Sequence, residues 1–168
     1  MITENFEYDS QNRLLVHKHQ VDNNPVEYLT QNKYNELSQL ESKKVGGIAA
    51  ASPLQQIDYR YNIRGWMTRI NDPSNLNGKL FGYEIKYHNP VNTQAIGRYN
   101  GNIAEIDWNN GSENLLKRYD YEYDKVNRLT KAFYKEPSTG ISGTFDEHLT
   151  YDLNGNIGTL KRWAIPVY

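Results

Sequence analysis

The 168-residue chain contains no cysteine, so disulfide frameworks, thiolate zinc sites and cysteine nucleophiles are all excluded. An excess of charge of either sign is also lacking, because the formal net charge is −1 at pH 7. The chain therefore offers no basic field for nucleic acid and no acidic tail. Long hydrophobic runs are absent, and the N-terminal MITENFEYDSQNRLL has no apolar core of a signal peptide. We therefore expect no membrane insertion, and any export address to lie outside this chain.

What the sequence has instead is tyrosine. Hydrophobic residues make up only 38% of the chain, which is low for a globular domain, but 14 residues are Tyr. Tyr buries a large area, keeps a polar tip and favours strands. The composition therefore indicates a β-sheet that is wet on at least one face.

A seven-residue motif recurs along the chain. It reads Tyr, then Asp or Asn, two variable residues, a small or turn-forming residue, a polar or aromatic residue, and finally Leu, Met or Ile. The copies are YDSQNRL at 8–14, YNELSQL at 34–40, YNIRGWM at 61–67, YDKVNRL at 123–129 and YDLNGNI at 151–157, with a shorter YNGNI at 99–103. Their spacing of about 26 residues, with one longer interval, is in the range of repeat proteins. The spacing predicts a single array of about six repeats over residues 1–168.

The motif and its flanks predict a β-hairpin. Stretches such as IDYRY (57–61) and LTKAFY (129–134) alternate with the period of half-buried strands. Asp or Asn can start a turn, and Gly or Asn tolerates the left-handed conformation that ends it. Ser38 takes that last position in one copy, so we expect its hairpin to be the loosest or to use another turn type. The residues assigned to this structural motif are Tyr8, Asp9, Tyr34, Asn35, Tyr61, Asn62, Gly65, Tyr123, Asp124, Asn127, Tyr151, Asp152 and Gly155.

The predicted fold class is all-β, with consecutive antiparallel hairpins stacked into a curved or spiralling sheet. A helix over 28–45 is an alternative, since several helix formers occur there, but the repeat register favours a strand. Segments 46–56 and 71–79 are small, flexible or rich in Pro and Asn, and are expected to be loops.

The repeated motifs resemble the YD repeats of the Rhs family of bacterial proteins, which are similar to those of teneurins and of the cocoon-forming components of insecticidal toxin complexes. The resemblance extends from Tyr8 to Arg162. It implies hairpins that stack into a hollow shell, which encloses a toxic C-terminal segment or presents a surface in cell contact. It also implies a polymorphic-toxin setting, in which larger members are secreted or displayed at the cell surface.

The chain departs from a full family member in having no match to the core-associated closing region and no toxin domain. We therefore expect a fragment, which pairs with further YD repeats of one larger polypeptide or associates edge to edge. An enclosed toxin segment is a further partner implied by the resemblance. Open sheet edges support this expectation, because repeat arrays normally need caps or neighbours.

Candidate catalytic and metal-binding residues are few. His17 and His19 share a strand face and could bind a metal together with a carboxylate, although solvent-facing His is the favoured interpretation. The repeated Asp residues suggest acid–base chemistry, but Asn replaces Asp at positions 35, 62 and 100, which a turn permits and a general acid does not. No phosphate loop or nucleophile elbow occurs. We predict no enzymatic activity, no metal and no cofactor.

Aromatic residues interleaved with Arg leave one alternative function open. Exposed Tyr and Trp on a β-face could stack sugars, so a surface carbohydrate-binding module is the second hypothesis, whereas the net charge argues against nucleic acid. Cross-strand pairing inside the sheet is the favoured account of the same residues. The candidate glycan-stacking residues are Trp66, Trp108 and Trp163.

Overall fold

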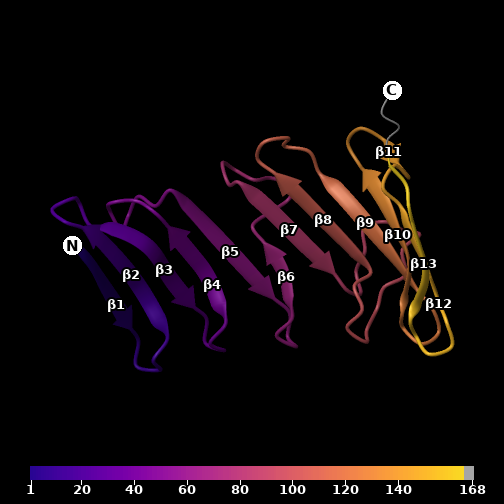
Figure 1. The fold of residues 1–168 in the computed structure, drawn as a ribbon, viewed down its shortest axis with the longest axis horizontal. Coiled ribbons are helices and arrows are strands. Elements are labelled where there is room, and N and C mark those ends of the chain that lie inside the picture. Colours follow the sequence, from indigo (N-terminus) through magenta and orange to yellow (C-terminus); the bar gives the residue numbers. More distant parts are fainter. Residues whose placement is uncertain (165–168) are drawn as a thin grey trace. The chain divides into compact units, whose positions relative to one another are not determined.

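A computed structural model describes residues 1–164 and shows a chain built from antiparallel strands (Figure 1). No helix occurs in this part of the chain, and hence none that could cross a membrane. The prediction of an all-β fold made of antiparallel hairpins is confirmed. The residues group into two compact units, where unit 1 comprises Met1–Asn71 and Asn77–Leu80, and unit 2 comprises Asp72–Leu76 and the chain from Phe81 onward.

Unit 1 is a meander in which each strand pairs with the next along the chain, and β1 lies at its outer edge. The segment 28–45 forms two of these strands, not the helix considered as an alternative. The strands are β1 (Ile2–Tyr8), β2 (Leu14–Val21), β3 (Glu27–Tyr34), β4 (Leu40–Val45), β5 (Gln55–Tyr61) and β6 (Met67–Ile70).

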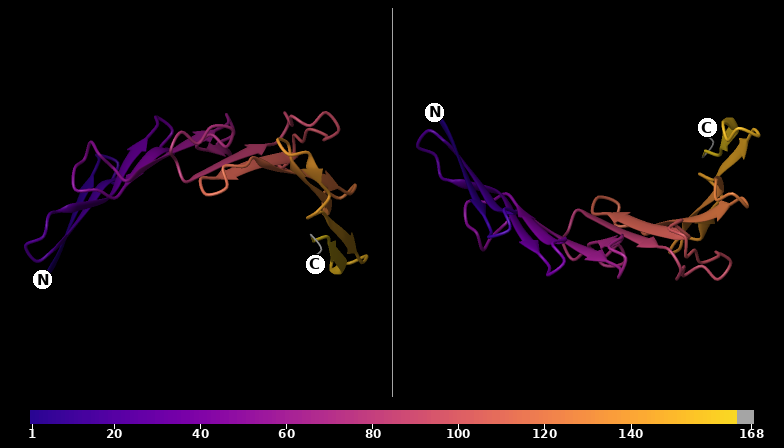
Figure 2. Two further views of the ribbon diagram at one scale, coloured as in Figure 1. Left: turned by 90° about the horizontal axis from the view of Figure 1, so that it is seen from above. Right: turned by 90° about the horizontal axis from the view of Figure 1, so that it is seen from below.

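Unit 2 follows the same plan, with one short strand, β11, pairing with β10 off the main path. Figure 2 shows the hairpin of β12 and β13 turned away from the plane of β8 and β9, so the sheet of this unit bends. The strands are β7 (Phe81–Lys86), β8 (Glu105–Asn110), β9 (Lys117–Tyr123), β10 (Leu129–Glu136), β11 (Ile141–Ser142), β12 (Glu147–Tyr151) and β13 (Ile157–Arg162).

Three longer connections interrupt the hairpins. Residues 46–54 join β4 to β5, so Gln55 and Gln56 belong to a strand, and residues 71–80 join β6 to β7. Residues 87–104 connect β7 to β8 and include the short motif copy 99–103, which has no strand directly before its Tyr. This copy therefore lies in a loop.

Burial is unusual because each unit is a single layer of strands. The buried apolar side chains are few, whereas several charged side chains of β7, β8 and β9 are buried. The loop 87–104 supplies part of their cover, since the backbone N–H groups of Val91 and Asn92 donate to Glu105. The buried polar residues of these strands are Lys86, Glu105, Asp107, Asn109 and Asp120.

Candidate functional site

The second residue of each full motif holds the hairpin turn. Its Oδ1 accepts hydrogen bonds from the backbone N–H groups two and four residues further on; for Asp9 the donors are Gln11 and Arg13, both at 2.9 Å. The same pair of bonds occurs at Asn35, Asn62, Asp124 and Asp152. Because only Oδ1 is used for this purpose, Asp and Asn serve equally well.

The fifth motif residue adopts a left-handed backbone. Ser38 has φ 63°, close to the values of the Asn and Gly residues at this place, and its turn has the same hydrogen bonds. Of the two alternatives predicted for this hairpin, a change of turn type is therefore wrong, and a looser hairpin stays a prediction. Two side chains of the preceding turn contact its Oγ, Arg13 Nη1 at 2.9 Å and Gln11 Oε1 at 3.1 Å. The fifth residues of the other full motifs, which also have a positive φ, are Asn12, Gly65, Asn127 and Gly155.

The first motif residue connects one hairpin to the preceding one. The Tyr34 hydroxyl donates to the carbonyl of Leu14 at 3.1 Å, and Leu14 is the last residue of the preceding motif. The same contact recurs from Tyr61 to Leu40 (3.1 Å), from Tyr123 to Ile103 (2.8 Å) and from Tyr151 to Leu129 (2.7 Å). We call each of these contacts a tyrosine junction.

All four tyrosine junctions share one strand register. The residue two places after the aliphatic acceptor pairs with the residue three places before the donor Tyr. The pairs are Val16 with Gln31, Ser42 with Asp58, Glu105 with Asp120, and Lys131 with His148. The junction is therefore a repeated geometric unit, independent of the differing side chains in each pair.

An Arg at the sixth motif position connects the turn to the junction. Arg13 forms an ion pair with Asp9 (Nε–Oδ2 2.6 Å), and its Cζ lies 4.7 Å from the ring centroid of Tyr34. Arg128 does the same with Asp124 (2.7 Å) and with the ring of Tyr151 (4.5 Å). Such a cation–π contact adds a modest attraction to the hydroxyl bond.

These contacts hold the turn carboxylates in their charged form. Backbone hydrogen bonds from Arg13 and Arg128, followed by the side-chain bonds from the same residues, lower the pKa of Asp9 and of Asp124. At Asp152 the side-chain bond from Asn156 contributes most to the lowered pKa. A carboxylate with a lowered pKa is a poor general acid near neutral pH, so these residues are not equipped for that role.

A buried ion network occupies one face of unit 2. Lys86 Nζ lies 2.7 Å from Glu105 and 2.5 Å from Asp107, while Arg118 donates to both oxygens of Asp107 at 2.7 and 2.8 Å. Glu105 is fully buried. Burial acts to raise the pKa of Asp107, but the hydrogen bonds from Arg118 and Lys86 outweigh it, and the pKa is lowered. Each charge in this network has an opposite charge in contact.

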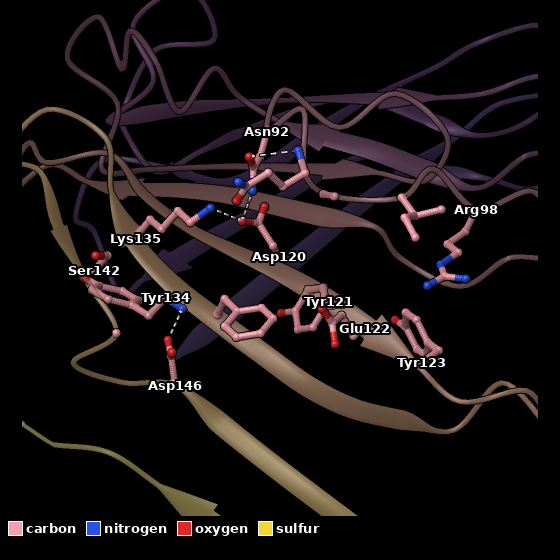
Figure 3. A pocket seen from close by; sticks show the side chains of 15 residues that line it. Asn92, Arg98, Asp120, Tyr121, Glu122, Tyr123, Tyr134, Lys135, Ser142 and Asp146 are labelled. Carbon is pink, nitrogen blue, oxygen red and sulfur yellow. Dashed lines mark hydrogen bonds and ion pairs between the residues drawn. The ribbon is translucent and has the colours of Figure 1, made fainter.

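A cavity of about 560 Å³ lies beside this network in unit 2. Figure 3 shows Lys135 and Asn92 directed at Asp120, with Tyr121 and Tyr123 along the strand beside them. Lys135 Nζ is 2.8 Å from Asp120 Oδ2 and Asn92 Nδ2 is 2.6 Å from it, whereas Oδ1 has no partner among residues 1–164. Burial raises the pKa of the Tyr121 hydroxyl, which therefore stays protonated. The volume suits a small molecule.

The two histidines considered as metal ligands lie beside one carboxylate. His17 and His19 both contact Glu4, at 2.8 and 3.3 Å, and hydrogen bonds from the two imidazoles lower the pKa of that carboxyl. No group of three or more possible metal ligands is assembled within residues 1–164. The carboxyl of Glu4 is therefore engaged by two imidazoles, and the pair does not extend to a larger ligand set.

The three Trp residues have different surroundings. Trp108 packs against Tyr119 (ring centroids 5.5 Å apart) and Tyr134 (6.0 Å), so its ring is part of an aromatic cluster within the sheet. Trp163 lies on His148 at 4.6 Å and keeps 42% of its surface exposed. Arg64 Cζ lies 5.1 Å from the ring of Trp66. Trp108 and Trp163 do not share a contact, so no common sugar platform is formed by these two.

Sequence reasoning missed the buried ion network and the cavity. In EIDWNN (105–110) the apolar residues suggest the inner face, yet Glu105, Asp107 and Asn109 are the buried ones. A signal was available in the close spacing of oppositely charged residues on neighbouring predicted strands, such as Asp107 and Arg118. It could not be used without knowing that loop 87–104 contacts Glu105 and Asp120 and so covers part of this face.

No protein-family model and no curated protein matches the chain. Similar solved structures include the crystal structure of TcdB2-TccC3 without its hypervariable C-terminal region (14% identity, TM-score 0.45, covering 96% of this chain and 9% of that chain). The crystal structures of TcdB2-TccC3-TEV (13%, 0.37, 89% and 9%) and TcdB2-TccC3-Cdc42 (10%, 0.33, 99% and 10%) are also similar. This chain spans about a tenth of their length.

Proposed function

We propose that this chain is a non-catalytic structural segment of a YD-repeat wall, which in a larger exported or surface-displayed protein encloses or presents a toxin or effector. The observation that carries the proposal is the tyrosine junction, which recurs with one register at Tyr34, Tyr61, Tyr123 and Tyr151. Because each hairpin binds the preceding one through the same contact, such a sheet can be extended by any number of hairpins. The motif residues are engaged in turns and junctions, which is the work of a scaffold.

An in-register deletion tests the scaffold role. Removing residues 34–60, one full interval between successive motif Tyr residues, brings Tyr61 to the place of Tyr34, with Leu14 as its acceptor. We expect this protein to keep a β-type far-UV circular dichroism spectrum and a cooperative melt. The matched control removes residues 35–47, about half an interval, which puts the next motif turn at the opposite end of the sheet and should abolish the folding of unit 1. Equal behaviour of the two proteins would refute the scaffold rule.

The second candidate function is carbohydrate binding. The cavity of unit 2 favours it, because Tyr121, Tyr123 and Phe133 line it together with the carboxylate of Asp120. A sugar ring can stack on the aromatic side chains, and its hydroxyl groups can donate hydrogen bonds to the carboxylate. A glycan array probed with the wild type, Trp66→Ala and Asp120→Asn separates the two functions. No binding above background leaves the scaffold. Binding removed by Asp120→Asn would establish the cavity as the sugar site, whereas binding removed by Trp66→Ala would place the site in unit 1.

A further inference from the structure

The two outer strands of the described chain are free edges. β1 pairs only with β2 and β13 only with β12 within residues 1–164, and every residue of both strands is exposed. β1 presents Ile2, Phe6 and Tyr8, and β13 presents Ile157 and Leu160. Edges with unpaired backbone groups and apolar side chains are ready to accept another strand.

Each edge also holds one half of a tyrosine junction. Tyr8 is the first residue of its motif, but its hydroxyl has no acceptor in the described part of the chain, and 53% of the residue is exposed. Ile157 is the last residue of its motif, and no Tyr hydroxyl of residues 1–164 reaches its carbonyl. At the four internal junctions these two halves meet. The donor half at β1 therefore matches the acceptor half at β13.

The charges of the two edges are complementary as well. β1 (ITENFEY) carries Glu4 and Glu7 and no basic residue, whereas β13 (IGTLKR) carries Lys161 and Arg162 and no acidic residue. Two β1 edges would bring like charges together, and so would two β13 edges. Glu7 and Arg162 also form ion pairs within the chain, with Lys18 and Glu147, so these charges act mainly on the choice of partner edge: opposite signs favour β1 facing β13 over either edge facing its own kind.

We propose that β13 of one copy of this chain pairs antiparallel with β1 of the next copy, in the register of the internal junctions. The inference rests on the proposed scaffold role, because it extends the same junction between molecules. The register places Thr159 opposite Asn5 and brings the Tyr8 hydroxyl to the Ile157 carbonyl. It also sets Arg162 diagonal to Glu4 on one face, within reach of long side chains. Because the β1 edge and the β13 edge are different surfaces, copies of the chain associate head to tail into an open oligomer.

Cysteine cross-linking tests the register directly, since the native chain contains no Cys. Asn5→Cys and Thr159→Cys proteins are prepared separately, mixed and oxidised, and the products are separated on a non-reducing gel. Directly opposite strand residues have β-carbons close enough for a disulfide. We expect a disulfide-linked dimer in the mixture and little in either protein alone. Replacing Asn5→Cys by Thr3→Cys shifts the pair by two residues and should reduce the yield several-fold.

Three outcomes would overturn the proposal. A dimer of Asn5→Cys alone would indicate symmetric β1–β1 pairing, an equal yield with Thr3→Cys would indicate edges without register, and no cross-link would indicate no pairing. Tyr8→Phe should weaken association about fivefold by sedimentation velocity, as expected for one lost hydrogen bond. If cross-linking fails while the 34–60 deletion still folds, the scaffold role stands and only the self-complementary edge is rejected.

Discussion

Removing the hydroxyl from each junction tyrosine measures what the tyrosine junction contributes to stability. A Tyr→Phe substitution keeps the ring and deletes one hydrogen bond, at 3.1 Å for Tyr34 and Tyr61, 2.8 Å for Tyr123 and 2.7 Å for Tyr151. Such a bond contributes about 1 kcal/mol net, and somewhat more where the acceptor is left without water. Tyr123, whose pKa is raised by burial, should lie at the upper end.

The matched control is Tyr8→Phe, because the Tyr8 hydroxyl has no acceptor within residues 1–164. Each junction variant should lower the melting temperature by about 2–4 °C, and Tyr8→Phe should leave it unchanged. Combining Tyr34→Phe with Tyr151→Phe should add the two losses, since the sites share no partner. Melting is followed by far-UV circular dichroism at a concentration low enough to keep the chain monomeric. An equal loss in Tyr8→Phe and Tyr123→Phe would refute the junction as the source of the stability.

Three further predictions concern the turns, the ion network and a close backbone contact. The pKa values of the turn carboxylates are lowered below 3.8, so the stability that these groups provide is complete above that pH and is lost as the pH falls through their pKa values in the folded protein. The urea midpoint of unfolding should therefore drop in acid. Replacing Asp9, Asp124 and Asp152 by Asn should make the midpoint less dependent on pH. Lys86→Met removes the nearer of the two counter-charges of buried Glu105, leaving Arg118 at 3.3 Å, and should cost about 3 kcal/mol in urea unfolding, whereas a neutral result would contradict the network. Gly82→Ala would place a β-carbon 2.8 Å from the backbone of Pro73, so amide hydrogen exchange should quicken around residues 72–76, and unchanged exchange would argue against that contact.

The hairpins were predictable because their determinants are local. Asp9 and Asn12 fix a turn with groups no more than four residues apart, and the alternation around the turn marks the strands. The junctions were less accessible, because the Tyr34 hydroxyl bonds a carbonyl 20 residues earlier. Composition indicates that Tyr is useful in a sheet, but not which backbone oxygen its hydroxyl meets.

The buried charges of unit 2 show why the rest could not be predicted. Alternation alone cannot decide which face of EIDWNN is covered, and a sheet with Ile106 and Trp108 on one side suggests a dry core there. The covering loop 87–104 reverses that expectation by donating backbone N–H groups to Glu105. Loop 87–104 interrupts the repeat, yet it determines which face of the neighbouring, regularly spaced strands is buried.

The charge at the second motif position is matched by an Arg at the sixth for Asp9 and Asp124, whereas Asp152 has the neutral Asn156 there. Where the turn residue is Asp9 or Asp124, an Arg neutralises it and reaches the next Tyr. Where it is Asn35, the partner is the neutral Gln39, whose Oε1 accepts from Asn35 Nδ2 at 2.8 Å. The turn therefore tolerates either pair, but only the charged pair adds a cation–π contact to the following hairpin. The second position thus specifies the turn, the first specifies the junction, and an Arg at the sixth strengthens the junction without being needed for the turn.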